Sequence, residues 1–163
     1  MVVYAQGVPL ALKVLGSFLF DKSKHEWESQ LDRLKKIPNE VIQNVLRVSF
    51  DRLDDNEKEI FLDIACFFQG HDKDCVMEIL TSCGFFPEIG IRILIEMSLL
   101  SVVENKLMMD NLLQKMCWEI VRQESPKQPG KRSRLWIHDD VNRVLKNNTV
   151  RDKCINLYFY LFL

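Results

Sequence analysis

The chain has 163 residues, of which 47% are hydrophobic, so it can bury the core of one ordinary domain or of two small ones. Its 22 Lys and Arg residues nearly balance its 23 Asp and Glu residues, which leaves a net charge of -1. This balance excludes a global positive field for nucleic acid or for an anionic membrane surface, so a charged partner must meet a local patch.

Neither apolar end of the chain predicts export or a membrane span. Residues 1–20 have no basic n-region and are interrupted by Lys13. Residues 154–163 have roughly half the length that a bilayer span requires.

The first half of the chain predicts four helices. Gly7-Val8-Pro9 precedes the first, whose apolar stripe begins at Leu10. Ser23 and Glu26 form a capping box for the second. The third follows Pro38, and its apolar residues are expected to face inward: Val41, Val45, Val48 and Leu53.

The fourth helix begins in the acidic cluster of residues 54–57, whose members suit N-cap and first-turn positions. From Ile60 to Phe68 it is apolar almost all round. Such a helix must lie in the middle of the core.

The second half predicts further helices around one hairpin. A short helix, residues 74–83, is followed by one that begins at Pro87 and ends near Met97. Two short apolar runs, residues 99–103 and 106–109, form the only convincing hairpin, because a polar turn separates them.

After the hairpin we expect a helix over residues 112–123, a loop over residues 124–134 and a last helix capped by Asp139 or Asp140. The predicted fold class is therefore mainly α. A helical bundle over residues 1–70 is followed by a winged helix with one short β-hairpin over residues 71–149, and residues 150–163 form a divergent apolar tail.

The five cysteines are scattered without a CxxC pair, at Cys66, Cys75, Cys83, Cys117 and Cys154. Most of them lie in apolar helical stretches, which predicts buried free thiols in a reducing compartment. We expect a cytoplasmic location, with the nucleus as an alternative.

Two clusters contain the residue types of a metal or catalytic site. His71, Cys75 and Cys83, with Cys66 nearby, do not have the usual spacing of zinc ligands, and no Cys has the electropositive setting of a catalytic thiol. His138-Asp139-Asp140 could suggest a hydrolase dyad, but an Asp at a helix start is far more often a cap. We expect no metal site and no catalytic residue.

One local basic run could meet phosphate or an acidic partner, although a solvated loop explains it equally well: Lys127, Lys131, Arg132 and Arg134. A winged helix also suggests DNA binding, through the helix of residues 87–97. That helix carries Arg92 against Glu88 and Glu96, so it offers phosphates no excess positive charge. DNA binding is the least favoured function, and we expect no nucleic-acid partner.

Four stretches are distinctive when taken together: QGVPLALKVLGSFLF (residues 6–20), VLRVSFDRLDDNEKEIFLDIACFFQG (45–70), LLQKMCWEIVRQESPKQPGKRSRLW (112–136) and VNRVLKNNT (141–149). They closely resemble the plant TIR-type nucleotide-binding, leucine-rich-repeat disease-resistance proteins. The resemblance covers residues 2–149 and corresponds to the helical and winged-helix subdomains of the family's NB-ARC module. We expect the TIR domain, the P-loop subdomain and the repeats to be missing.

The resemblance implies a set of nucleotide-binding residues. In the family a Gly-x-Pro turn reaches the nucleotide, which here implies contacts from Gly7, Pro9 and Leu10 to ADP or ATP. A proline there holds the backbone against a flat base without donating a hydrogen bond. A proline that merely begins a helix is the alternative.

The family's Met-His-Asp signature falls on Met109, Asp110 and Asn111, so this chain reads Met-Asp-Asn. A histidine can donate a hydrogen bond to the ADP diphosphate, whereas an ionised Asp110 has no donor and sets negative charge against phosphate. Our hypothesis is that this position no longer stabilises the ADP state. Asp110 can also cap the next helix, with Asn111 as a neighbouring candidate.

The resemblance implies part of the ADP/ATP-dependent switch of an intracellular plant immune receptor. The expected partners are the receptor's P-loop and leucine-rich-repeat domains, or a full-length receptor. Because the sequence contains no GxxxxGK[ST], we expect no enzymatic hydrolysis and weak or absent nucleotide binding by this chain. The alternative is a truncated interaction or regulatory module that docks onto full-length receptors.

Overall fold

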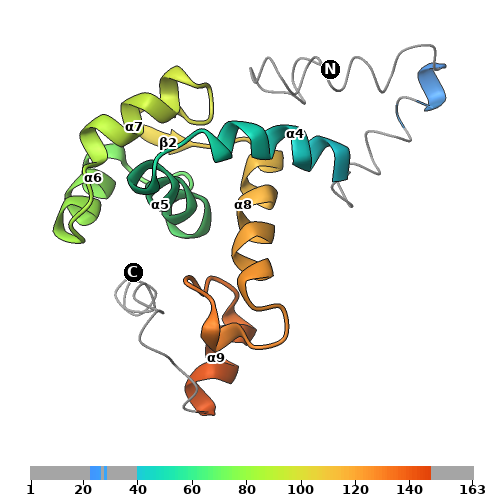
Figure 1. Ribbon diagram of the computed structural model, residues 1–163. Coiled ribbons are helices and arrows are strands. Elements are labelled where there is room, and N and C mark those ends of the chain that lie inside the picture. The colour runs from blue at the N-terminus through green and yellow to red at the C-terminus, as the bar shows by residue number, and fades with distance from the viewer. Residues whose placement is uncertain (1–22, 27, 29–39, 148–163) are drawn as a thin grey trace.

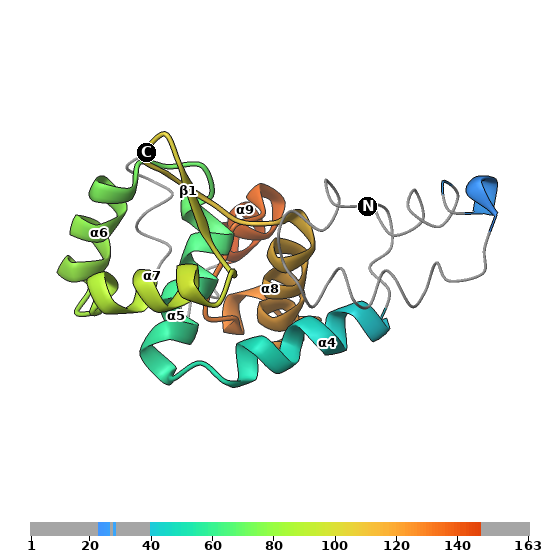
Figure 2. The same ribbon diagram turned by 90° about the horizontal axis from the view of Figure 1, so that it is seen from above.

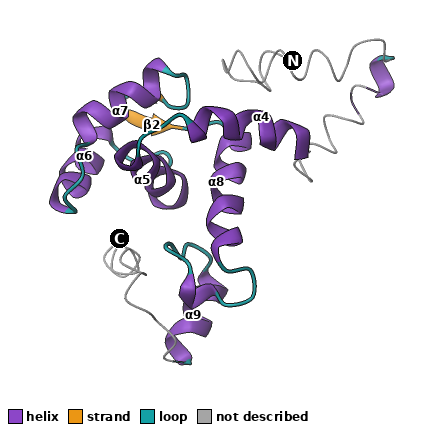
Figure 3. Ribbon diagram, viewed as in Figure 1, coloured by secondary structure: helices purple, strands orange, loops and turns teal. Residues whose placement is uncertain are grey.

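The computed structural model describes residues 23–26, 28 and 40–147. Within them the helices are α4 (Glu40–Asp51), α5 (Asp55–Asp63), the π-helix η1 (Ile64–Phe68), α6 (Lys73–Ser82), α7 (Pro87–Glu96), α8 (Asn111–Glu124), the 3-10 helix η2 (Pro129–Lys131) and α9 (His138–Lys146). The strands β1 (Ser101–Val103) and β2 (Lys106–Met108) form an antiparallel hairpin. The predicted fold class, mainly helical with one short hairpin, is confirmed (Figure 3).

Helix α8 connects two parts of the described chain. Helices α5, α6 and α7 and the hairpin gather near its N-terminal end, whereas α9, against which η2 packs, lies at its other end (Figure 1). Seen from above, α5, α6 and α7 lie to one side of α8 (Figure 2). Helix α5 packs against both α7 and α8, and α4 packs against α8. Helices α5 to α8 and the hairpin together have the arrangement of a winged helix.

The packing is continuous across residue 70, where the sequence predicts a domain boundary. Helix α5 and η1 precede that residue, yet they pack on α7 and α8, which follow it. The expected division at residue 70 stays a prediction. Most of the expected helical bundle lies outside the described residues, at residues 1–22, 27 and 29–39.

The start of α5 confirms the predicted acidic cap. The Asp54 carboxylate accepts a hydrogen bond from the Glu57 amide at 2.7 Å, and the Glu57 carboxylate accepts one from the Asp54 amide at 2.9 Å. Each side chain therefore satisfies a backbone donor that has no partner within the helix. The capping box of Ser23 and Glu26 is confirmed in the same way.

The helix predicted to lie in the middle of the core does so. Ile60, Phe61 and Ile64 are fully buried, and Phe68 nearly so. The main apolar cluster surrounds them with residues from α4 to α8, and a second, smaller cluster comprises Leu135, Val141 and Val144.

At its C-terminal end α5 continues into the wider π-helix η1, and a carbonyl group of η1 accepts hydrogen bonds from side chains of α8. The Ala65 carbonyl accepts hydrogen bonds from the Gln114 side-chain Nε2 at 3.0 Å and from the Trp118 indole N–H at 3.1 Å. A π-turn changes the usual pattern of backbone hydrogen bonds. Two side chains of α8 thereby hold η1 in place.

The hairpin turn explains why the polar pair Glu104-Asn105 separates the strands. Both residues have positive φ, 50° and 59°, as a tight two-residue turn requires. The Asn105 side-chain amide also donates to Asp72 at 2.8 Å and to Asp74 at 2.9 Å. The turn is thus tied to the start of α6.

Two local predictions are wrong. Val48 does not face inward: half of its side chain is exposed, because Leu46, Phe50 and Leu53 form the buried face of this segment. Neither Asp139 nor Asp140 caps the last helix, which has Ile137 at its N-cap and no capping side chain.

The cysteines also differ from expectation. Cys117 is buried and Cys66 is half-buried, as predicted for free thiols, but Cys75 and Cys83 are exposed on and just after α6. Their helix covers the core with one narrow stripe that contains Val76 and Leu80. Cys154 lies outside the described residues.

Candidate functional site

Met109, Asp110 and Asn111 form a sharp bend between β2 and α8, here called the elbow. The Met109 side chain is buried, and Asp110 occupies the N-cap of α8 with extended backbone angles. Asn111 is the exposed first residue of the helix. The structure thus places the three switch residues predicted from the sequence on one short bend.

The side chain of Gln69, which lies 40 residues from Met109 in the sequence, forms hydrogen bonds with the backbone of the elbow. The Met109 amide donates to Gln69 Oε1 at 2.8 Å, and Gln69 Nε2 donates to the Met109 carbonyl at 3.1 Å. Both backbone groups of Met109 are therefore paired with one amide side chain.

Asp110 caps α8, as its alternative interpretation predicts. Its Oδ1 accepts a hydrogen bond from the Leu112 amide at 2.7 Å. Burial raises the pKa of the Asp110 carboxyl above its ordinary value, although backbone hydrogen bonds from Leu112 and Leu113 oppose the rise. The neutral form, which can donate a hydrogen bond, is thus favoured more than in an exposed Asp.

The other predicted nucleotide contacts stay predictions. Gly7, Pro9 and Leu10 lie outside the described residues, so their position relative to Asp110 is not defined. Asn111 is exposed and does not supply the N-cap, which belongs to Asp110.

The basic run is divided between surface and interior: Lys127 and Lys131 are exposed, but Arg132 and Arg134 are buried, so the four residues form neither of the two expected arrangements, a phosphate-binding patch or a wholly solvated loop. Arg132 and Arg134 are 4% and 2% exposed. Arg132 pairs with Asp140 at 2.8 Å. Arg134 donates to Asp63 and to Glu59, both at 2.6 Å, and to the Glu59 carbonyl at 3.0 Å. Their charge is used inside the protein and is not available to phosphate.

The ionic cluster around Arg134 fixes the C-terminal segment, residues 125–147, to α5. Burial alone would lower the pKa of Arg134, but the carboxylates of Asp63 and Glu59 raise it overall, so the guanidinium stays charged. Trp136 stacks on Trp118 of α8 with ring centroids 6.1 Å apart. These contacts hold the segment against the winged helix.

The zinc and thiol candidates are not assembled into a site. Within residues 23–26, 28 and 40–147, no group of three or more His, Cys, Asp or Glu side chains could hold a metal ion. Burial raises the pKa of the Cys66 thiol far above its ordinary value and does the same for Cys117, which opposes thiolate formation.

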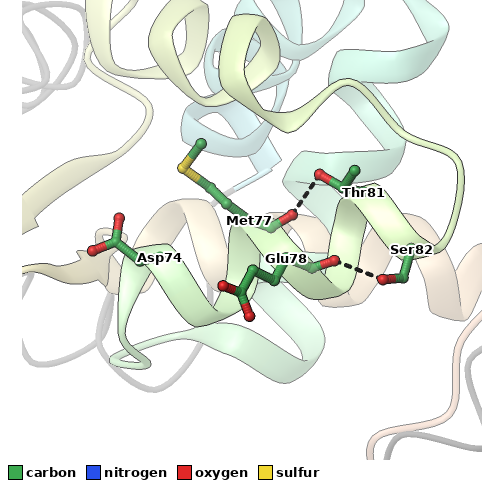
Figure 4. A pocket seen from close by; sticks show the side chains of 5 residues that line it. All are labelled: Asp74, Met77, Glu78, Thr81 and Ser82. Carbon is green, nitrogen blue, oxygen red and sulfur yellow. Dashed lines mark hydrogen bonds between the residues drawn. The ribbon is translucent and has the colours of Figure 1, made fainter.

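A shallow hollow runs along the outer face of α6 (Figure 4). It is lined by Asp74, Met77, Glu78, Thr81 and Ser82. The hydroxyls of Thr81 and Ser82 donate to the carbonyls of Met77 and Glu78 within the helix, at 2.7 Å and 2.9 Å. Both hydroxyl groups already donate to carbonyls of their own helix, and all the lining residues belong to α6. We therefore assign no binding or catalytic role to this hollow.

Helix α7, the expected DNA-recognition helix, exposes a mixed face. Glu88, Arg92 and Glu96 are exposed beside Ile89, which is 55% exposed. Phe86, immediately before the helix, is 72% exposed. This face combines apolar surface with a net negative charge, whereas binding to the phosphates of DNA requires positive charge.

Sequence reasoning missed Gln69 and Arg134 as structural residues. Asp63 was an available signal, because a single acid inside a helix that is apolar all round requires a buried partner. Gln69 had no comparable signal, since a glutamine at the end of an apolar run is equally common on the surface.

Among the residues that the structure describes, every helix is too short or too polar to span a bilayer.

A family model supports the winged-helix interpretation directly. The model of the winged-helix domain of Roq1-like disease resistance proteins matches residues 54–125. The match begins at the N-cap of α5 and ends just after α8.

Curated relatives cover more of the chain. Disease resistance protein RUN1 of Vitis rotundifolia is 49% identical over 145 residues, which is 89% of this chain and 11% of the relative. Disease resistance protein RPV1 of the same species is 47% identical over 145 residues, 89% of this chain and 10% of the relative. TMV resistance protein N of Nicotiana glutinosa is 44% identical over 150 residues, 91% of this chain and 13% of the relative. The chain thus spans about a tenth of the length of these relatives.

Proposed function

Because this chain belongs to the TIR-NB-LRR family of plant disease-resistance proteins, we propose that it forms part of the receptor's ADP/ATP-dependent switch. In this proposal the winged helix closes on a nucleotide held mainly by a P-loop subdomain, and the elbow faces the diphosphate. Nucleotide state would then shift the population between resting and active receptors.

The observation that carries the proposal is the elbow. Asp110 caps a helix of 14 residues, whose N-terminus is a favourable place for an anion, and it follows a buried, firmly held Met109. Because the pKa of Asp110 is raised, a larger fraction of the carboxyl is neutral than in an exposed Asp, and the neutral form can donate a hydrogen bond to phosphate. When it is ionised, its charge opposes the diphosphate, so the ADP state is weakly held.

The proposal assigns this chain no hydrolysis of its own. The sequence contains no GxxxxGK[ST] loop to cradle phosphates. The chain would contribute closure and coupling, while the phosphate chemistry belongs to another part of the receptor.

The test is ADP release from a complete receptor that carries this segment, followed with a fluorescent ADP analogue. Asp110→His should slow release about tenfold or more, since a hydrogen bond to a charged group is worth about 1.5–3 kcal/mol. Gln123→His is the matched control, because it places the same side chain at an exposed position of α8, at the end of the helix away from the elbow. Equal release rates for Asp110→His and the parent would refute the role of the elbow.

A second candidate function is docking onto a full-length receptor of this family. The exposed Phe86 and Ile89 favour it, because two large apolar side chains lie together at the start of α7. Phe86→Ser with Ile89→Ser should abolish co-purification with such a receptor, whereas Val103→Ser, at an apolar position as exposed as Ile89, should not. Equal co-purification of both variants would remove this candidate.

A further inference from the structure

Gln69 continues a set of hydrogen bonds that runs beside β2. The Gly70 amide donates to the Leu107 carbonyl at 2.7 Å, and the Leu107 amide donates to the His71 carbonyl at 2.9 Å. Farther along, the Lys73 amide donates to the Asn105 carbonyl at 2.7 Å. The segment after η1 therefore lies antiparallel to β2 and supports it like a third strand.

At the elbow this ladder changes from backbone to side chain. Gln69 is the residue that ends η1, so its own backbone is turning out of the helix. Its amide offers one donor and one acceptor to Met109, the same pattern that a backbone amide pair offers in a sheet. One side chain thus replaces the next step of the ladder.

The consequence lies one residue farther along. Met109 is buried, and both its N–H and its C=O form hydrogen bonds with Gln69. The backbone that leads into Asp110 is therefore fixed in position. Gln69 is fixed in turn, because it follows Phe68, which is 2% exposed in the core. Without this support, only the backbone hydrogen bonds from Leu112 and Leu113 would set the direction of the Asp110 side chain.

We propose that Gln69 is the positioning residue of the elbow: it holds the Met109 backbone against η1 and so sets where residue 110 meets a nucleotide. This inference rests on the proposed switch function for its role in nucleotide release. The elbow and η1 then move as one unit, and a shift of the nucleotide at residue 110 is passed to the core helix through Gln69.

The test compares Gln69→Met with Gln114→Met in the folded 163-residue chain by NMR. Methionine has nearly the same length as glutamine and makes neither hydrogen bond. Gln114→Met is the matched control, because it also removes a bond from a glutamine amide to the backbone, while the Ala65 carbonyl keeps Trp118 as a donor. If Gln69→Met does not fold, Gln69→Asn keeps an amide that is too short to reach both groups of Met109.

Two signals are expected to change with Gln69 and not with Gln114. Exchange of the Met109 amide hydrogen should become at least about tenfold faster, as one lost hydrogen bond of about 1.4 kcal/mol implies. The pKa of Asp110 should fall toward its ordinary value, because burial is the main cause of its rise and a released elbow becomes more exposed. Unchanged values of both signals in the folded Gln69 variant would overturn the proposal.

A separate measurement in the complete receptor tests the link to nucleotide. In an Asp110→His background, Gln69→Met should restore fast ADP release and Gln114→Met should not. Equal rates for these two variants would overturn the role of Gln69 in nucleotide release. A failure of Asp110→His itself would instead refute the proposed switch function, and the two NMR signals would still decide whether Gln69 positions the elbow.

Discussion

The elbow and the C-terminal segment are both attached to the same central helix, but by different chemistry. The elbow is held to the end of η1 by two neutral hydrogen bonds between the Gln69 side chain, which donates one and accepts the other, and the Met109 backbone. The C-terminal segment is held to α5 by the buried guanidinium of Arg134, which pairs with Asp63 and Glu59. Both attachments join residues far apart in the chain, by 40 and by 71 positions.

Because one attachment is ionic and the other is neutral, the loss of each should affect stability differently. A buried charge is tolerable only while its partner is present, so the loss of either member should release the segment at a large cost in stability. A neutral amide pair contributes less, and its loss should loosen the elbow without unfolding the core. The first attachment suits permanent structure, and the second suits a position that must respond to a ligand.

The largest expected effect comes from breaking the charged attachment. Arg134→Met should lower the free energy of unfolding by about 3–5 kcal/mol, because it removes the main cation beside a buried carboxylate. Urea unfolding measures the loss. Arg122→Met is the matched control, since its pair with Glu119 is at the surface, and it should cost about 0–1 kcal/mol. Similar losses in the two variants would contradict the comparison.

A smaller effect is expected where apolar packing alone holds two helices together. A Cβ at Gly90 of α7 would lie 2.7 Å from the Cδ1 atom of Ile60, which is fully buried in α5. Overpacking costs about 1–3 kcal/mol, and alanine returns about 1 kcal/mol of helix propensity. Gly90→Ala should therefore lower stability by about 1 kcal/mol in thermal or urea unfolding.

Ile60→Val provides the check on that explanation, because it removes the Cδ1 atom that the new Cβ would meet. The double variant should be more stable than the sum of the two single losses predicts. Strict additivity, or a stabilised Gly90→Ala, would show that α7 shifts freely against α5.

The smallest effect concerns the charge on the elbow. The pKa of Asp110 is raised in the folded state, so the folded protein binds more protons than the unfolded chain between the ordinary pKa and the raised value. Stability from this group is therefore present at low pH and is lost as pH rises through that window. Asn caps a helix as well as Asp and does not titrate.

Asp110→Asn should consequently be slightly more stable than the parent at pH 7, by about 0.5 kcal/mol or less, as is usual at a partly exposed position. The difference should disappear as pH falls below the ordinary Asp value of about 3.9. Urea midpoints measured for both proteins from pH 3.5 to pH 7 decide the matter. An advantage of the Asn variant that grows toward low pH would have the wrong sign.

Much of the local structure could be predicted from the sequence, because its signals act between near neighbours. The capping box of Asp54 and Glu57, the helix start at Pro87 and the turn at Glu104-Asn105 each depend on residues at most three positions apart. The burial of the helix through Phe61 also follows from its composition alone. Asp110 as the N-cap of α8 belongs to the same class.

The sequence by itself determined this order of elements and the family to which the chain belongs. Only the tertiary structure decided which polar groups are internal: Arg134 and Arg132 look like a solvated basic loop, and Gln69 looks like an ordinary helix end. The physical reason is distance along the chain. A cap or a turn is completed by its neighbours, whereas a buried cation or a clamping amide acquires its partner only when the fold brings distant residues together.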